Sequence, residues 1–323
     1  MKIRPYKKGD EKNILALDRS LETHCWNRRN LDNWYWKYTD NNPSGKSFIW
    51  LIEKDDNIIV HFAAVPYKLK VFDKEIIASH SIGSMIDKRY QNKGILKYVS
   101  DKLFEDIKSN IPFTYGFPNK LAYGIHIECM KYDDLIFFDT WKIEKSKIKI
   151  NNDDLLSFKK IDKFDNKFDK LWNSCSDEYK ICVVRNKDYL NWRYNRPDWK
   201  YFHFGIYEKN EIKGYTILKL YKEDKIIRGH IIDVFSHFND RKTLDNIVEG
   251  SFNFFNKHNV DEITCFIWGN PLFEKILKEK NFFREETKIP LVIRVNKEDF
   301  EYKKEVKDNK NWYFTMGDST EVF

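Results

Sequence analysis

Apolar residues recur at helical spacing in two stretches of the chain, and a short apolar strand follows each stretch. From Gly94 to Lys108, and again from residue 244 to residue 255, apolar side chains fall on one face of a helix. The residues concerned are Leu96, Val99, Leu103 and Ile107 in the first stretch, and Leu244, Ile247, Val248, Phe252 and Phe255 in the second. The apolar segments 112–117 and 262–267 predict the strands that follow.

The surroundings of these helices also repeat, so the chain contains one plan twice. Trp36-Lys37-Tyr38 precedes an apolar strand at 48–52, and Trp192-Arg193-Tyr194 precedes one at 201–206. A polar turn and a further strand follow in both copies. The order of helix, hairpin, long strand, helix, strand, helix and strand predicts an α/β (α+β) fold. We expect two tandem domains, each a mixed, mostly antiparallel twisted sheet flanked by helices.

A polar stretch at 145–154 separates the two copies. We therefore expect one domain at residues 1–148 and a second at residues 149–323, which agrees with a length of 323 residues at roughly 150 residues per domain. The C-terminal tail is charged but contains the apolar piece 312–318, which we expect to dock back onto the fold.

Composition and charge exclude several classes of protein. The chain is 41% hydrophobic, yet no uncharged apolar run approaches the roughly 18 residues that cross a bilayer, and the charged start lacks a signal-peptide core. We expect a cytoplasmic protein without membrane insertion. The net charge of +7 arises from charges of both signs mixed along the chain, which favours a solvated surface over a nucleic-acid partner. The five scattered cysteines lack zinc-ligand spacing, so we expect reduced thiols and no metal.

The segment from Ser84 to Leu96 contains the most informative chemistry. It passes from a strand through a turn into a helix, and Gly94 stands where the helix begins. A glycine lets the backbone approach a ligand closely, and a helix N-terminus offers free N–H groups and a positive dipole end. Lys88, Arg89 and Lys93 add positive charge. This combination suits phosphate oxygens, although an ordinary strand-to-helix turn would have the same pattern.

The segment resembles the acetyl-CoA diphosphate loop of the GNAT (GCN5-related N-acetyltransferase) superfamily, Q/R-x-x-G-x-G/A. Gln91 and Gly94 match that motif, whereas Leu96 replaces its final small residue and would narrow the room beside the phosphates. Asn119-x-x-Ala122 resembles the pair that follows strand five in many members. The Trp36 and Trp192 motifs, with the terminal segment 312–319, resemble a tandem GNAT subgroup found among bacterial polysaccharide genes.

The resemblance implies that each domain is GNAT-like and that acetyl-CoA is the acyl donor. Its binding residues would be Met85, Ile86, Asp87, Arg89, Gln91, Asn92, Lys93, Gly94, Ile95, Leu96 and Asn119. The equivalent stretch of the second copy, 234–242, has no glycine and begins with bulky residues. We therefore expect acetyl-CoA only in the N-terminal domain, with the C-terminal domain as a degenerate copy that shapes the acceptor site.

The activity implied is transfer of an acetyl group to the primary amine of a small acceptor, such as an amino sugar. Backbone N–H groups near Met85 and Ile86 would polarise the thioester carbonyl. Counting back from the loop places His80 where many members have a glutamate base. His126 and Tyr123 are alternatives for the acid that protonates the thiolate. Asp318 could supply a base or an amine-binding carboxylate, although each of these four residues could equally be structural.

Two other activities remain open. A Fem-like aminoacyl transferase also uses tandem GNAT domains, but the helical arm that would bind tRNA is not evident in this sequence. A non-catalytic CoA-binding module is the other alternative, because Leu96 and the position of the acid depart from the family pattern. The sequence is compatible with a monomer or a homodimer.

Overall fold

The computed structural model describes residues 1–21, 30–39, 41–91, 93–149 and 156–319. Its elements follow the repeated order expected from the sequence. The first copy consists of β1 (Lys2–Pro5), α1 (Glu11–Ser20), α2 (Leu31–Tyr38), β2 (Phe48–Lys54), β3 (Asn57–Val71), β4 (Lys74–Ile86), α3 (Ile95–Ile107), β5 (Phe113–Gly116), α4 (Lys120–Gly124) and β6 (Asp133–Glu144). The second consists of β7 (Ser157–Lys160), α5 (Asn166–Cys175), β8 (Ile181–Val183), α6 (Lys187–Tyr194), β9 (Tyr201–Glu208), β10 (Glu211–Glu223), β11 (Ile226–Ser236), α7 (Arg241–Lys257), β12 (Glu262–Cys265), β13 (Ile267–Trp268), α8 (Pro271–Glu279) and β14 (Phe283–Val295).

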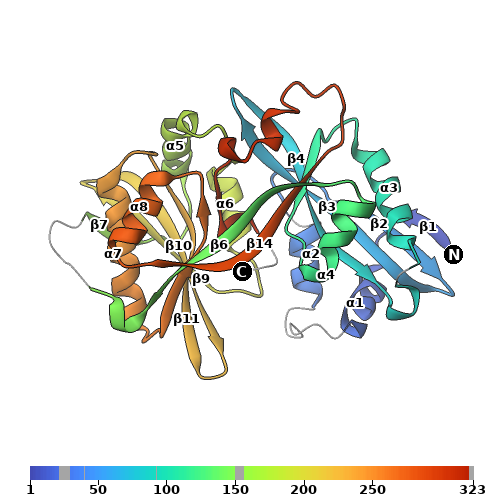
Figure 1. Cartoon of the computed structure of the whole chain (residues 1–323), viewed down its shortest axis with the longest axis horizontal. Coiled ribbons are helices and arrows are strands. Elements are labelled where there is room, and N and C mark those ends of the chain that lie inside the picture. The colour runs from blue at the N-terminus through green and yellow to red at the C-terminus, as the bar shows by residue number, and fades with distance from the viewer. Residues whose placement is uncertain (22–29, 40, 92, 150–155, 320–323) are drawn as a thin grey trace.

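Apart from β13, the strands of both copies join in one sheet of 13 strands (Figure 1). Its order is β1-β2-β3-β4-β5-β14-β6-β12-β11-β10-β9-β7, with β8 added beside β3. The pairs β4–β5 and β11–β12 are parallel, and the other strand pairs of this sheet are antiparallel. This confirms the predicted fold class. Equivalent strands of the two copies also lie at equivalent distances from the two edges of the sheet, as expected for two copies of one plan.

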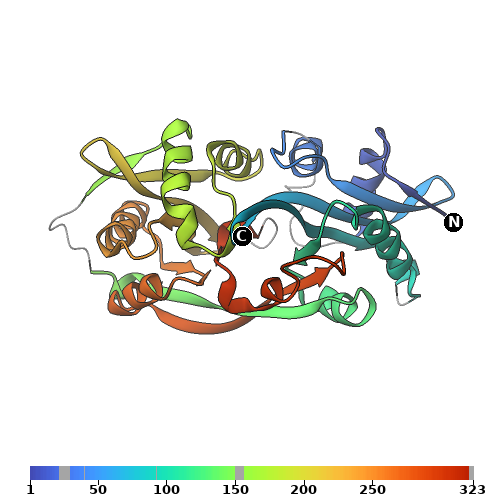
Figure 2. The ribbon, with the colours of Figure 1, turned by 90° about the horizontal axis from the view of Figure 1, so that it is seen from above.

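The two halves exchange their last strands. The C-terminal part of β14 pairs with β5 of the first half, and the C-terminal part of β6 pairs with β12 of the second half. Between these ends β6 and β14 pair with each other, from Phe283–Lys142 to Ile293–Asp133. Figures 1 and 2 show both strands running from one half of the molecule to the other. Each half of the sheet is therefore completed by a strand from the other.

Helices cover both faces of the N-terminal half. Leu96, Val99 and Leu103 of α3 pack with Phe62 and Val60 in one core cluster on one face of β3. Residues of α1 and α2 pack with alternating residues of the same strand in a second cluster on the opposite face. The alternation of side chains along a strand produces this division. The two faces of β4 and β5 are therefore covered by different helices.

The two Trp motifs join the halves. The indole rings of Trp36 and Trp192 stack with centroids 5.3 Å apart. Each indole Nε1–H donates to the backbone carbonyl of the other residue, at 2.9 Å from Trp36 and 3.4 Å from Trp192. The two motifs therefore pack against each other at the junction of the halves.

The C-terminal tail docks as predicted, and Trp312, Phe314 and Met316 are buried. Its short strand β15 (Phe314–Thr315) pairs with β13. Asp318 follows in a buried ion pair, with its Oδ2 2.8 Å from Nη2 of Arg185. Asp233 of β11 also pairs with that guanidinium, at 3.2 Å. The tail is thus fixed to the second half by buried charge as well as by apolar contact.

No helix in the part of the chain that the structure describes is both long and apolar enough to cross a membrane.

We expect Asp318→Ala to lower the free energy of unfolding by about 3–5 kcal/mol, because it leaves the buried Arg185 charge partly uncompensated. Asp101→Ala is the matched control, since Asp101 forms an exposed ion pair with Lys97. That variant should change stability by less than about 1 kcal/mol. Urea denaturation of both variants measures the difference, and equal midpoints would show that the tail contact does not stabilise the fold.

Candidate active site

Strands β4 and β5 separate soon after they meet. Their parallel pairing is limited to Ser79 with Thr114 and His80 with Tyr115. Beyond this point β5 ends at Gly116, while β4 continues to Ile86. The imidazole of His80 stacks on the Tyr115 ring, with centroids 5.0 Å apart and planes within 5°. This stack closes the base of the opening between the strands.

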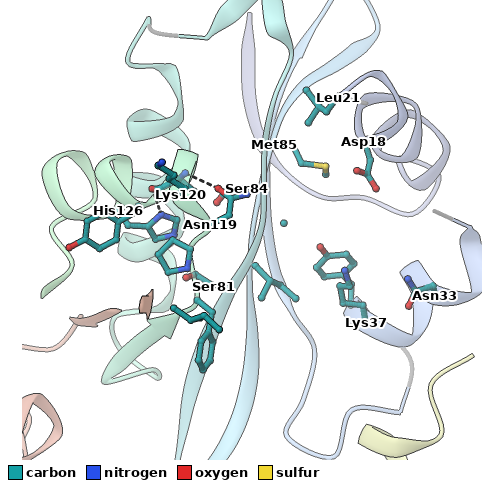
Figure 3. A pocket seen from close by; sticks show the side chains of 18 of the residues that line it. Asp18, Leu21, Asn33, Lys37, Ser81, Ser84, Met85, Asn119, Lys120 and His126 are labelled. Carbon is teal, nitrogen blue, oxygen red and sulfur yellow. Dashed lines mark hydrogen bonds between the residues drawn. The ribbon is translucent and has the colours of Figure 1, made fainter. Parts of the chain in front are cut away.

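A cavity of about 1000 Å³ lies at this opening. Ser81 to Met85 of β4 and Phe117 to Asn119 after β5 contribute to its wall. One side comes from α1 and α2, and the other from α4 and its continuation (Figure 3). Phe137 of β6 also lines it, and the second half contributes Arg196, Asp198, Trp199 and residues 287–290. The cavity thus contains groups from both halves of the chain.

His126 lines this cavity from a π-helical turn, Ile125–Cys129, that continues α4. A π turn inserts an extra residue into a helix and re-aims its side chains, and such turns are frequent at functional sites. The imidazole is 4% exposed, and its Nδ1–H donates to the carbonyl of Ala122 at 2.9 Å. Burial lowers the pKa of His126 below the ordinary value of 6.5. The ring is therefore neutral at pH 7, with its Nε2 lone pair left as an acceptor.

Tyr123 also lines the cavity, but its hydroxyl donates to Asp134 of β6, with oxygens 2.7 and 2.9 Å away. This hydrogen bond to a carboxylate raises the pKa of the Tyr123 phenol. Because the proton is already held by Asp134, Tyr123 is less suited than His126 to exchange a proton with a ligand.

His80 and Asp318, the other two predicted catalytic residues, do not contribute to the described lining of this cavity. His80 is 2% exposed and packs among Tyr115, Phe117 and Tyr67. Asp318 is 1% exposed and holds the tail to Arg185. Both side chains have evident structural roles.

The predicted diphosphate loop lies at the far end of β4. Asp87 accepts the backbone N–H of Arg89 at 2.9 Å and pairs with its guanidinium, which lowers the pKa of the Asp87 carboxyl. Gln91 donates to the carbonyl of Ile86 at 3.3 Å, and the Lys93 ammonium lies 5.4 Å from the Tyr90 ring centroid. Asn92 lies outside the described residues.

The start of α3 fits a diphosphate. Gly94 is its N-cap and has a φ of +68°, which side chains rarely tolerate, and a Cβ built there would meet nothing within 4 Å. The open space and the N–H groups of Gly94 and Ile95 suit anionic oxygens. Leu96 differs from expectation: its side chain is 5% exposed and packs in the core below the helix. It therefore takes no room beside the phosphates.

Met85 and Asn119 lie nearer the centre of the site. Met85 lines the cavity on the α1 side (Figure 3). The Asn119 side chain caps α4, accepting the backbone N–H groups of Leu121 and Ala122 at 3.1 and 2.9 Å. The next residue along β4 is Ile86, and Asp87 N–H donates to Ile59 at 2.9 Å. By antiparallel alternation, the Ile86 N–H points away from β3, towards the opening.

Sequence reasoning missed the carboxylates of the cavity. Among the described lining residues these are Asp18 of α1 and Asp198 of the second half. Both Asp198 oxygens accept from Arg196, at 2.6 and 2.9 Å. Asp18 lies across β4 from His126 in Figure 3. The position of Asp18 in α1 does not predict that it lines a cavity, because an aspartate on the polar face of an amphipathic helix normally faces solvent.

The corresponding opening of the second half is filled by the chain itself. Strands β11 and β12 pair in parallel from Arg228 to His230 and then separate. The tail lies between them, with β15 paired to β13 and the Thr315 hydroxyl donating to Asp233 at 2.9 Å. Of these two openings, the one in the first half contains the cavity described above.

Comparison with known proteins agrees with this geometry. Residues 2–126 match the acetyltransferase (GNAT) domain family. No curated protein sequence matches the chain. Among solved structures, a probable N-acyltransferase of unknown function from Enterococcus faecalis V583 superposes with a TM-score of 0.68 at 12% identity, over 91% of this chain and 72% of that one.

Two further structures show the same fold. A GCN5-related N-acetyltransferase from Anabaena variabilis gives a TM-score of 0.67 at 15% identity, over 91% of this chain and 73% of that one. Saccharomyces cerevisiae N-myristoyltransferase with bound myristoyl-CoA gives 0.61 at 9% identity, over 91% and 82%. The chain has the fold of these structures, and its residues 2–126 match the GNAT acetyltransferase domain.

We expect His126 to titrate below pH 6.5 and to carry its neutral-state proton on Nδ1, because the ring is buried and donates to Ala122. Nitrogen-15 NMR of the labelled imidazoles measures both, with the His126 signals assigned from a His126→Gln sample. A His126 midpoint at or above pH 6.5, or a proton on Nε2, would contradict this expectation.

Proposed function

We propose that the chain is an N-acyltransferase that moves an acetyl group from acetyl-CoA to the primary amine of a small acceptor. One observation carries the proposal: β4 and β5 open onto a cavity with His126 on one side and Asp18 on the other. The GNAT domain match and the fold of the neighbouring structures support the choice of an acyl-CoA donor.

The donor would lie along the open edge of β4, with its diphosphate at Gly94 and its thioester in the opening above His80 and Tyr115. Lys93 and Arg89 would add charge attraction to the diphosphate. Bound there, acetyl-CoA supplies an activated acyl carbon with a thiolate leaving group. The chain supplies orientation, polar groups and the route for the protons.

The amine would enter from the side of α1. An alkyl amine has a pKa near ~10 and arrives mostly as ammonium at pH 7, so one proton must leave before attack. We assign this step to Asp18, whose carboxylate would attract the ammonium and accept its proton. The burial of Trp34 and Tyr38 beside it would limit competing water.

A second proton must pass from the amine nitrogen to sulfur as the C–N bond forms and the C–S bond breaks. We assign this transfer to His126. Its Nδ1–H is held by Ala122, so Nε2 can accept the proton from nitrogen and return it to the departing thiolate. The products are an amide and free CoA, and the proton taken by Asp18 passes to solvent.

The acceptor is bounded by both halves. Arg196 lies over the Trp199 ring at 4.1 Å and over the Trp36 ring at 4.5 Å, and its Nη2 is 3.4 Å from Oδ1 of Asn33. This wall of aromatic faces and planar polar groups favours a small polar ring, which supports an amino sugar as the acceptor. It also supports an acceptor-shaping role for the second half, residues 149–323.

We expect one acetyl-CoA to bind per chain, and Gly94→Arg to abolish binding, because the new side chain would fill the phosphate space and strain a left-handed residue. Isothermal calorimetry measures both. Gly9→Arg is the matched control, since Gly9 also has a positive φ and open space but lies outside the cavity lining. Two molecules bound per chain, or undiminished binding to Gly94→Arg, would refute the donor site.

We expect Asp18→Asn to lower kcat/KM for the amine by about 100- to 10,000-fold while leaving the affinity for acetyl-CoA unchanged. Release of free CoA thiol is followed with amino sugars, nucleotide-linked amino sugars, polyamines and amino acids as acceptors. Asp32→Asn, on the exposed surface of α2, is the control. If the two variants show equal activity on the best acceptor, Asp18 has no role in amine activation.

A further inference from the structure

The ladder between β3 and β4 contains an irregularity beside the cavity. Met85 is paired with His61, and Ile82 with Ala63, so Gly83 and Ser84 together face the single residue Phe62. Gly83 has a φ of +65°, and a Cβ there would lie 2.3 Å from the Tyr38 hydroxyl. The position therefore requires glycine, and a bulge of this kind turns a peptide group out of the regular ladder.

His61 holds that peptide group. Its ring is fully buried, and Nδ1 lies 2.6 Å from the carbonyl oxygen of Gly83. Because a carbonyl can only accept, Nδ1 carries the proton, and the hydrogen bond fixes both the tautomer and the direction of the carbonyl. The His61 ring also packs against Tyr38 of α2, with centroids 5.5 Å apart. The Gly83 carbonyl is thus drawn towards the face of the sheet that α1 and α2 cover.

The peptide between Gly83 and Ser84 is trans, so its N–H points opposite to its carbonyl. With the carbonyl drawn to His61, the Ser84 N–H is aimed to the other side, where Asn119 and His126 lie. Figure 3 shows Ser84 on this side of β4 and Met85 on the side of Asp18. Both residues line the cavity.

From this geometry we infer that His61 is a positioning residue: by holding the Gly83 carbonyl, it aims the Ser84 N–H at the carbonyl oxygen of the acyl donor. The inference rests on the proposed function. A hydrogen-bond donor that is already in place before the reaction stabilises the negative charge that develops on that oxygen during attack, and it need not reorganise at that moment. His61 itself does not touch the acyl donor, so its effect passes entirely through the peptide between Gly83 and Ser84.

The test compares two ligands that differ in one carbonyl. Acetyl-CoA has the thioester oxygen, and S-ethyl-CoA lacks it. We expect the wild-type protein to bind acetyl-CoA about 3- to 10-fold more tightly, the contribution of one hydrogen bond. His61→Leu should reduce this ratio to about 1 without changing the affinity for S-ethyl-CoA. His61→Asn, whose Nδ2–H can replace Nδ1–H, should restore it.

A second measurement requires no variant and so does not depend on how well His61→Leu folds. In the wild-type protein labelled with nitrogen-15 serine, the Ser84 amide proton should move downfield with acetyl-CoA and not with S-ethyl-CoA. An unchanged affinity ratio in a folded His61→Leu, or an equal Ser84 shift with both ligands, overturns the inference alone. If neither ligand binds the wild-type protein, the proposed function fails instead.

Discussion

The candidate site depends on the separation of two parallel strands. Strands β4 and β5 are paired at two positions, and the stacked rings of His80 and Tyr115 mark the end of that pairing. Beyond the stack, the facing backbone edges have room for a ligand between them, and the helices of opposite faces look into the same opening. A donor lying along β4 and an acceptor arriving from α1 can therefore meet at one point. The same constraint explains why His80 is buried: it closes the opening from below.

The second half contributes through its strands rather than through a second site. Exchange of β6 and β14 brings residues 287–290 to the wall of the cavity, and the stacked Trp36 and Trp192 hold the segment from Arg196 to Trp199 against α2. Meanwhile the tail occupies the opening between β11 and β12, where Arg185 binds both Asp233 and Asp318. One copy of the plan thus retains an open site, while the other has become its support.

The local pattern of apolar and polar residues was sufficient to predict the helices and strands and the position of the turn before α3. Leu96, Val99, Leu103 and Ile107 predicted α3 nearly to its ends, and the helix begins directly after Gly94, as expected. Contacts between distant residues were not accessible in this way. Strand alternation does not specify a neighbour, so the exchange of β6 and β14 was not foreseen. Asp318 looked like a free carboxylate because Arg185 lies 133 residues away in the chain. Asp18 gave no signal, because an aspartate on the polar face of a helix normally faces solvent.

A crystal structure grown with acetyl-CoA tests the central claim most directly. We expect electron density for one molecule per chain, with its diphosphate against the backbone of Gly94 and Ile95 and its thioester between Ser84 and Phe117. Density between β11 and β12 with the tail displaced, or a diphosphate bound away from α3, would contradict it.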